Sequence, residues 1–133
     1  MAEFTKPKHG EVCWRELHTQ NLGAAKEFYQ GMFGWTLEQS KTTEMDYDEI
    51  HVGEKAVGGI MPITDCWGEN WEKIPSRWAT YISVENTDEA IEKIKQMGGG
   101  VCVEAFDAPN VGRMAVVSDP SGAAFSIIQF ISE

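Results

Sequence analysis

The chain has few basic residues and no long apolar run, and each shortage excludes a class of function. Its 133 residues include 11 Lys and Arg against 21 Asp and Glu, a net charge of −10. This charge repels phosphate backbones and anionic lipids, so we expect neither nucleic-acid nor membrane binding. No segment approaches the roughly 20 consecutive apolar residues that span a bilayer, and the first eight residues lack the apolar stretch of a signal peptide.

Cysteine is also scarce. Cys13, Cys66 and Cys102 cannot all pair with one another, and they share no metal-ligand spacing such as C-x-x-C. Free thiols without an export signal fit a reducing compartment, so we expect a cytoplasmic protein. Five Trp, six Phe and three Tyr argue against a disordered acidic chain. What remains is a folded domain whose partner is a small molecule or another protein.

Hydrophobic periodicity predicts two helices and eight strands. The first helix has apolar residues on one stripe and begins after Asn21, a suitable N-cap, and ends at Gly34. In chain order we expect a strand over 12–19, a helix over 22–33, strands over 35–41, 45–52 and 55–63, a loop over 64–76, a strand over 77–85, a helix over 86–96, and strands over 101–105, 112–118 and 123–131. This order is β-α-β-β-β twice.

An offset of 65 residues relates the two halves. At that offset Asn21 meets Asn86, Glu27 meets Glu92, Met32 meets Met97 and Gly34 meets Gly99. These positions define the two helices, so the chain contains an internal repeat of one supersecondary unit.

Several segments resemble the vicinal oxygen chelate superfamily, which includes glyoxalase I, bleomycin-resistance proteins and extradiol dioxygenases. Residues 24–29 (AAKEFY) followed by 33–35 (FGW) resemble the family's first helix, and 58–61 (GGIM) its fourth strand. Residues 78–84 (WATYISV) resemble the start of its second module, and 112–125 its G-R…DP-x-G-A-x-F ending. The resemblance runs from about Glu11 to the end of the chain, closest to its hydroxylase-like or glyoxalase-like branch.

The resemblance implies an α+β fold in which two βαβββ modules form a curved mixed sheet, with helices on the outer face and a concave cavity for the ligand. The modules would span 11–63 and 77–133, joined by the loop over 64–76, with 1–10 as a flexible lead-in to one structural domain. Family members often pair, so we expect a homodimer. Strand alternation then turns Trp14, Glu16 and His18 toward the cavity and Leu17 toward the helix.

Metal-dependent members of the family hold their ion with four side chains, one on the first and one on the last strand of each module. The matching positions here are Trp14, Met61, Ala79 and Ser126. None is a competent ligand for a hard or borderline divalent ion, so we expect no metal and no other cofactor. The alternative is an ion held by Glu16 and His18, with His51 as a third ligand.

Glu16 is the candidate catalytic residue, because a carboxylate desolvated in the cavity suits a general base. It is equally compatible with a structural pairing. Trp14 and Tyr81 either stack on a flat ligand or fill the cavity, and Arg113 either meets an anionic ligand or forms a salt bridge. The side chains expected to contact a ligand are Trp14, His18, Tyr47, Met61, Tyr81, Arg113 and Ser126.

Three functions remain open. The first is metal-free binding of a small organic molecule, with Glu16 as general base if the protein is a lyase, isomerase or oxygenase-like enzyme. The second is sequestration of a drug or metabolite without turnover, for which the charge of −10 would attract cations. The third is a metal-dependent lyase or dioxygenase with non-standard ligands.

Overall fold

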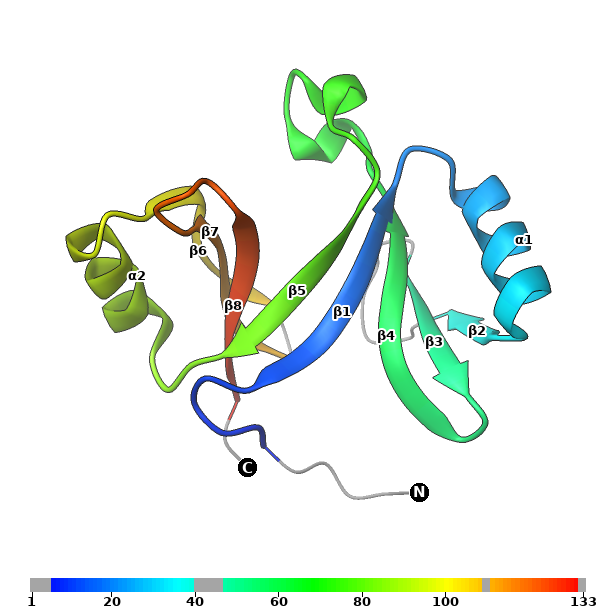
Figure 1. Ribbon diagram of the computed structural model, residues 1–133, viewed down its shortest axis with the longest axis horizontal. Helices are drawn as coiled ribbons and strands as arrows, with labels where there is room; N and C mark the ends of the chain where they lie inside the picture. Colours follow the sequence, from blue (N-terminus) through cyan, green and yellow to red (C-terminus); the bar gives the residue numbers. More distant parts are fainter. Residues whose placement is uncertain (1–5, 40–46, 109–110, 132–133) are drawn as a thin grey trace. The chain divides into compact units, whose positions relative to one another are not determined.

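A computed structural model describes residues 6–39, 47–108 and 111–131 of the chain. The elements follow in the order β1 (Val12–Thr19), α1 (Leu22–Phe33), β2 (Thr36–Gln39), β3 (Asp48–Val52), β4 (Lys55–Pro62), η1 (Asp65–Trp67), η2 (Trp71–Lys73), β5 (Arg77–Ser83), α2 (Thr87–Gln96), β6 (Gly100–Ala108), β7 (Gly112–Ser118) and β8 (Ala124–Phe130) (Figure 1). The predicted α+β fold with two βαβββ modules is confirmed. We refer to β1–β4 with α1 as the first module and to β5–β8 with α2 as the second.

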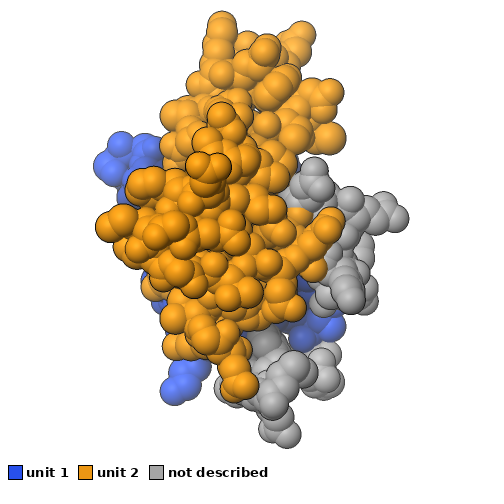
Figure 2. Space-filling view, turned by 90° about the vertical axis from the view of Figure 1, so that its right-hand side faces the viewer, with its two compact units in different colours: residues 1–14, 79–133 blue, residues 15–78 orange. Residues whose placement is uncertain are grey.

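The chain divides into two compact units whose boundaries fall inside β1 and β5 (Figure 2). Unit 2 contains residues 15–78, and unit 1 contains residues 1–14 and 79–133. Residues 6–14 are therefore built into unit 1, where the Gly10 amide donates to the Ser83 carbonyl (2.7 Å) and the Ser83 amide donates to the Glu11 carbonyl (2.9 Å).

In unit 2 the strand order is β2-β3-β4-β1, with β1 and β4 parallel and the other pairs antiparallel. Helix α1 covers one face of these strands, and the core consists of Leu17, Ile50 and Ile60. The helix begins where sequence predicts, because the Asn21 side chain accepts a hydrogen bond from the amide of Ala24, and it ends at Gly34 in a left-handed conformation (φ 69°).

In unit 1 the strand order is β5-β8-β7-β6, with β5 and β8 parallel. Helix α2 packs on a core of five buried residues, which are Val84, Ile91, Ala115, Val117 and Ile127. Each unit thus pairs its first and last strand in parallel and buries its own apolar cluster under its own helix. The repeat read from the sequence is a repeat of structure.

Most predicted boundaries agree with the structure within two residues, and two differences are informative. Strand β6 is longer than the predicted 101–105, because it pairs with β7 through two register shifts that lengthen the ladder. The loop over 64–76 contains two short 3₁₀ helices. Residues 40–41 and 45–46 of the predicted strands, and 1–5 of the lead-in, lie outside the described residues.

In the described part of the chain, no helix has the length and apolar character needed to span a bilayer.

Candidate functional site

The face of unit 2 opposite α1 is lined by the cavity-facing residues that alternation predicted for β1. Within the β1–β4 pairing, Glu16 lies opposite Gly59 and His18 opposite Met61, while Leu17 and Ile60 between them belong to the core under α1. Because partners in a ladder share a face of the sheet, Glu16, His18 and Met61 project from the same side. We call this side, which is the one that α1 does not cover, the open face of the first module.

Glu16 and His18 form a buried pair on this face. Nε2 of His18 lies 2.7 Å from Oε1 of Glu16, and the two residues are only 6% and 5% exposed. A carboxylate accepts hydrogen bonds, so the proton of this bond belongs to Nε2. When the ring is neutral, its Nδ1 carries a lone pair. This Nδ1 is buried and has no hydrogen-bond partner among the residues that the structure describes.

Tyr47 lies on the same face beside this pair. A Cβ added at Gly59 would collide with the Tyr47 hydroxyl and ring, so the ring occupies the space above the residue that pairs with Glu16. Because residue 59 is a glycine, the Tyr47 ring can lie directly against it. Sequence analysis placed Tyr47 in the site without fixing the face of its strand, and the structure places it next to the Glu16 position.

The loop between β4 and β5 brings Trp67 into contact with His18. The Trp67 ring meets the His18 ring edge-on, with centroids 4.8 Å apart, and the Arg77 guanidinium lies 5.7 Å from the Trp67 ring centroid. Gln20 anchors the loop by donating from Nε2 to the carbonyls of Trp71 (2.8 Å) and Ile74 (2.7 Å). Sequence analysis missed Gln20 and Arg77, because no local pattern distinguishes them from other exposed polar residues.

The other predicted ligand contacts lie in unit 1. Tyr81 and Ser126 are paired across β5 and β8, and both are buried. The carbonyl of Tyr81 accepts a hydrogen bond from Sγ of Cys13 (3.6 Å). Trp14 is partly buried near the end of the β1 segment that belongs to unit 1. The structure therefore gathers Glu16, His18, Met61 and Tyr47 in unit 2 and Tyr81 with Ser126 in unit 1.

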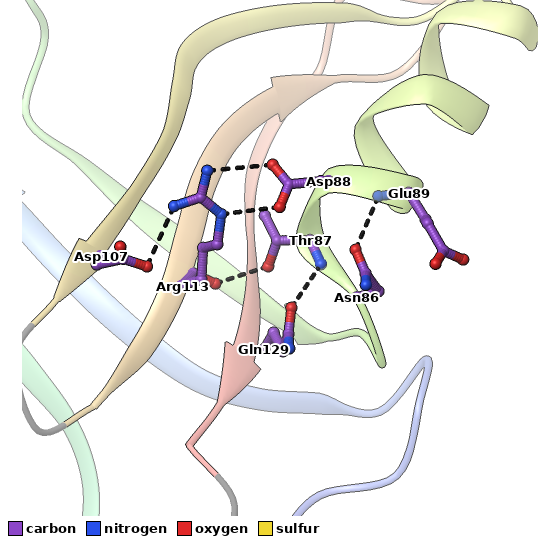
Figure 3. A network of polar contacts seen from close by, with 7 residues as sticks. All are labelled: Asn86, Thr87, Asp88, Glu89, Asp107, Arg113 and Gln129. Atoms are coloured by element: carbon purple, nitrogen blue, oxygen red, sulfur yellow. Dashed lines mark hydrogen bonds and ion pairs between the residues drawn. The ribbon is translucent and has the colours of Figure 1, made fainter.

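Arg113 has the salt-bridging role that the sequence left open for it (Figure 3). Its Nε and Nη2 donate to the two carboxylate oxygens of Asp88 (2.9 and 3.1 Å), and its Nη1 donates to Asp107 (3.1 Å). The hydrogen bonds that Arg113 donates to Asp88, and then the one that it donates to Asp107, raise the pKa of the Arg113 guanidinium above its ordinary value. The backbone carbonyl of Arg113 accepts from Thr87 Oγ1 (2.7 Å), so this residue ties β7 to the start of α2.

The sheet register corrects one of the four positions that the resemblance equated with metal ligands. Residues 16 and 81 are 65 apart, yet Glu16 pairs with Gly59 and Tyr81 pairs with Ser126, which are 67 apart. The structural equivalent of Ser126 is therefore Gly59 and not Met61. The offset of 65 holds for the first strand and helix but not for the last strand. The corrected set of Trp14, Gly59, Ala79 and Ser126 offers one hydroxyl and no imidazole, carboxylate or thiolate, which does not fit a divalent ion.

The alternative set of Glu16, His18 and His51 is also placed by the structure. Nε2 of His51 contacts Glu38 Oε2 (3.0 Å) and Glu49 Oε1 (3.2 Å) at the β2–β3 pairing, while His18 contacts Glu16. Within residues 6–39, 47–108 and 111–131, no group of three or more His, Cys, Asp and Glu side chains is arranged to hold a metal ion.

Comparison with known proteins places the chain in a family. Over 131 residues it is 32% identical to the putative glyoxylase CFP32 of Mycobacterium tuberculosis, covering 97% of the chain and 49% of that protein. The chain thus spans about half the length of this relative. It is 31% identical to the lactoylglutathione lyase of Escherichia coli O157:H7 over 126 residues, covering 86% of the chain and 92% of the lyase.

Solved structures show the same fold. Methylmalonyl-CoA epimerase from Mycobacterium tuberculosis superposes with a TM-score of 0.61 at 14% identity, covering 92% of this chain and 89% of the epimerase. At that identity the likeness concerns the fold alone. The family model for the Glyoxalase/Bleomycin resistance protein/Dioxygenase superfamily matches residues 14–127. With that match across most of both modules, the chain belongs to the Glyoxalase/Bleomycin resistance protein/Dioxygenase superfamily.

Proposed function

We propose that this protein binds a small organic molecule on the open face of the first module and uses the Glu16–His18 pair as its general base without a metal ion, with Nδ1 of His18 accepting the proton and Glu16 orienting the ring. The observation that carries the proposal is the buried 2.7 Å contact between Glu16 and His18, together with the unpartnered Nδ1 of His18. An unpaired buried acceptor is costly, typically by about 1–3 kcal/mol. A ligand that offers an O–H, N–H or acidic C–H group at Nδ1 relieves that cost.

The geometry supports proton transfer. A proton accepted at Nδ1 makes the His18 ring a cation, and the Glu16 carboxylate at Nε2 stabilises that charge at 2.7 Å. The two residues together take up one proton, and Glu16 holds the ring in the orientation and tautomer that leave Nδ1 as the acceptor. Proton abstraction and return is the chemistry of isomerases and lyases. Trp67 and Tyr47 lie beside the pair and offer flat surfaces to a ligand.

The proposal that no metal ion takes part rests on the side chains that stand at the positions of the family's metal ligands. In this family, when an ion is bound, it polarises substrate oxygen; here Trp14, Gly59, Ala79 and Ser126 stand at the corresponding positions. The carboxylate–imidazole pair is the group left to move a proton. Purified protein should therefore contain only substoichiometric Zn, Ni, Mn and Fe by elemental analysis. A stoichiometric metal that is lost in Glu16→Ala would contradict the proposal.

A second function, sequestration without turnover, is favoured by one observation. The chain has a net charge of −10, and a carboxylate lies buried on the open face beside aromatic rings. That combination attracts cationic aromatic compounds. It needs no proton transfer, so it predicts saturable binding with the ligand recovered unchanged.

The test is a thermal-shift screen followed by titration. We would use methylglyoxal with and without glutathione, the flat cation acridine orange, and bleomycin, and then assay product for every compound that binds. Glu16→Gln and His18→Gln should each weaken binding or turnover by about 10–100-fold, the equivalent of losing one or two hydrogen bonds to a charged group.

The matched control is Glu38→Gln, because Glu38 also contacts a histidine (His51, 3.0 Å) but is 66% exposed at its side chain. It should leave binding unchanged. Wild-type behaviour of Glu16→Gln would remove Glu16 from the site, and binding without product would select sequestration.

A further inference from the structure

The atom that accepts the proton in the proposed reaction is closed to solvent. Nδ1 of His18 is buried, the whole residue is 6% exposed, and no residue that the structure describes bonds to this nitrogen. A ligand can give up a proton to Nδ1 only by coming within hydrogen-bond distance of it. A group that covers His18 must therefore move before a ligand can bind there.

Glu16 and Trp67 both contact the His18 ring, and they differ in how firmly each is held. Glu16 lies on β1 with His18, and its Oε1 is 2.7 Å from Nε2, the nitrogen that does not accept the proton. Trp67 lies in the loop between β4 and β5, with its ring centroid 4.8 Å from that of His18. A ring in a loop can rotate without breaking a ladder hydrogen bond of the sheet. Trp67 is therefore the group that can uncover Nδ1.

The loop that carries Trp67 pairs much of its backbone with itself. It extends beyond the end of β4 and contains η1 and η2, neither of which has a buried residue (Figure 1). The amide of Trp67 donates to the Thr64 carbonyl (2.9 Å), and the amide of Trp71 donates to the Gly68 carbonyl (3.2 Å). A segment with few buried contacts changes conformation at low free-energy cost. The loop can thus adjust around Trp67 while the sheet stays intact.

Two residues hold the Trp67 ring in its contact with His18. Gln20, which follows β1 directly, donates from its side chain to two carbonyls of the loop and so fixes the loop backbone. Arg77, the first residue of β5, holds the ring itself, because its guanidinium lies 5.7 Å from the ring centroid in a cation–π arrangement. All four residues belong to unit 2. We call this placement of the ring the closed position.

The contacts that would break decide which motion opens the site. Rotation of the Trp67 side chain alone gives up one edge-on ring contact and one cation–π contact, both of them weak at a partly exposed residue. Movement of the whole loop would also break the two hydrogen bonds from Gln20 and leave two loop carbonyls in need of new donors. Rotation of the side chain is therefore the less costly motion.

We propose that Trp67 is the gate of the Glu16–His18 site, with Arg77 and Gln20 as the residues that position it. In the closed position the indole ring covers Nδ1, and rotation of the ring admits a ligand to the space that it leaves beside His18. The ligand must replace the ring contact that His18 gives up, which favours planar compounds. The inference rests on the proposed function, because it takes Nδ1 as the atom that a ligand must reach.

The experiment measures the accessibility of His18 without any ligand. Diethyl pyrocarbonate acylates neutral imidazole nitrogens, and mass spectrometry of the digested protein follows each of the three histidines separately at one fixed pH. Trp67→Ala should speed acylation of His18 at least about ten-fold, because a closed local state no longer limits access. The matched control is Trp71→Ala, because Trp71 is a partly buried tryptophan of the same loop. It should leave the rate at His18 unchanged.

Arg77 supplies a second test that leaves the gate ring in place. Arg77→Met removes the charge and keeps much of the side-chain length, so it should speed acylation of His18 by about two- to five-fold, the loss of an exposed cation–π contact. Arg77→Lys keeps a cation and should protect His18 as the wild type does. Gln20→Ala, which frees the loop backbone, should also speed the reaction. His51, whose side chain is 16% exposed, is the internal reference and should react at one rate in every variant.

Circular dichroism checks that the variants keep the fold. Equal rates at His18 in the wild type, Trp67→Ala and Arg77→Met overturn the proposal, because Nδ1 is then reached without movement of the ring. An acceleration in Trp71→Ala as large as in Trp67→Ala also overturns it, because the whole loop is then loosened. The same holds for an acceleration at His51 that matches the one at His18. None of these rates involves a ligand, so the gate can fail while the proposed function holds, and the reverse.

Discussion

The two modules share one fold and differ in the chemistry of their exposed faces. The core positions correspond: Ile60 and Ile127, which are 67 apart, are both buried on the helix side of the last strand. On the opposite face the matched positions hold different residue types, because Glu16 and His18 are matched by Tyr81 and Ser83. Duplication has kept what packs the sheet under its helix. The face opposite the helix differs between the two modules, and our proposal places the functional site in the first.

The largest expected effect tests whether the two cores are equivalent. Ile60→Ala and Ile127→Ala each remove a buried side chain from the same structural position, so each should lower the free energy of unfolding by about 2–5 kcal/mol. Because the sites correspond, the two losses should agree within about 1 kcal/mol in urea denaturation. If Ile127→Ala costs much less stability than Ile60→Ala, and Phe125→Ala costs more, then Phe125 is the structural equivalent of Ile60. In that case the offset of 65 would hold for the last strand too.

A smaller loss of stability is expected from substitution of two glycines, one packed against backbone in the second module and one packed against a side chain in the first. A Cβ at Gly112 would collide with the backbone of Gln129, whereas a Cβ at Gly59 would collide with the Tyr47 side chain. The β7–β8 ladder cannot move aside without losing hydrogen bonds, so Gly112→Ala should cost about 1–3 kcal/mol. Tyr47 can rotate, so Gly59→Ala should cost less.

The same Gly59→Ala variant should weaken ligand binding, because it removes Tyr47 from beside Glu16. Urea denaturation and the ligand titration check the two halves of this prediction. Equal stability losses at both glycines, or a Gly59→Ala variant that binds as the wild type does, would contradict it.

The smallest effect concerns the last turn of each module. The β3–β4 turn consists of Gly53 and Glu54, whereas the β7–β8 turn is organised by Asp119, whose carboxylate accepts from Ser121 Oγ (2.6 Å), Ser121 N (2.8 Å) and Ala123 N (3.1 Å). The hydrogen bond from the Ser121 side chain, and then those from the backbone, lower the pKa of Asp119 below 3.8.

A carboxyl group whose pKa falls on folding contributes stability above its unfolded pKa, and that contribution disappears as the pH drops through the folded pKa. Asp119→Asn should therefore lower the Tm slightly at neutral pH. The difference from the wild type should shrink in buffers below pH 3.8. A difference that stays constant with pH would show that the carboxylate charge is not the cause.

Much of the fold was predictable because it depends on local signals. Asn21 and Gly34 bound α1 as expected, since a side-chain cap and a left-handed glycine are local chemistry. Strand alternation correctly put Leu17 in the core and Glu16 on the opposite face. The length of β6 was not predictable, because its register shifts arise from pairing with β7, and periodicity within one strand carries no information on its partner.

The candidate site was predictable in composition but not in geometry. Two residues at spacing two on a strand must share a face, so Glu16 and His18 were expected together. Their 2.7 Å contact depends on side-chain rotamers. Trp67 reaches His18 because Gln20 holds the loop, a long-range arrangement that no motif encodes. The equivalence of Met61 with Ser126 failed because the β4 and β8 registers differ by two residues.

The most direct test of the central claim, that the first module holds the functional site, is an NMR titration of the labelled protein with the strongest binder from the screen. Amide shifts should change at residues 16–18 of β1 and 59–61 of β4, and they should vanish in Glu16→Gln while persisting in Glu38→Gln. Shifts concentrated instead at residues 81–83 of β5 and 126–128 of β8, unaffected by Glu16→Gln, would place the site in the second module and contradict the account.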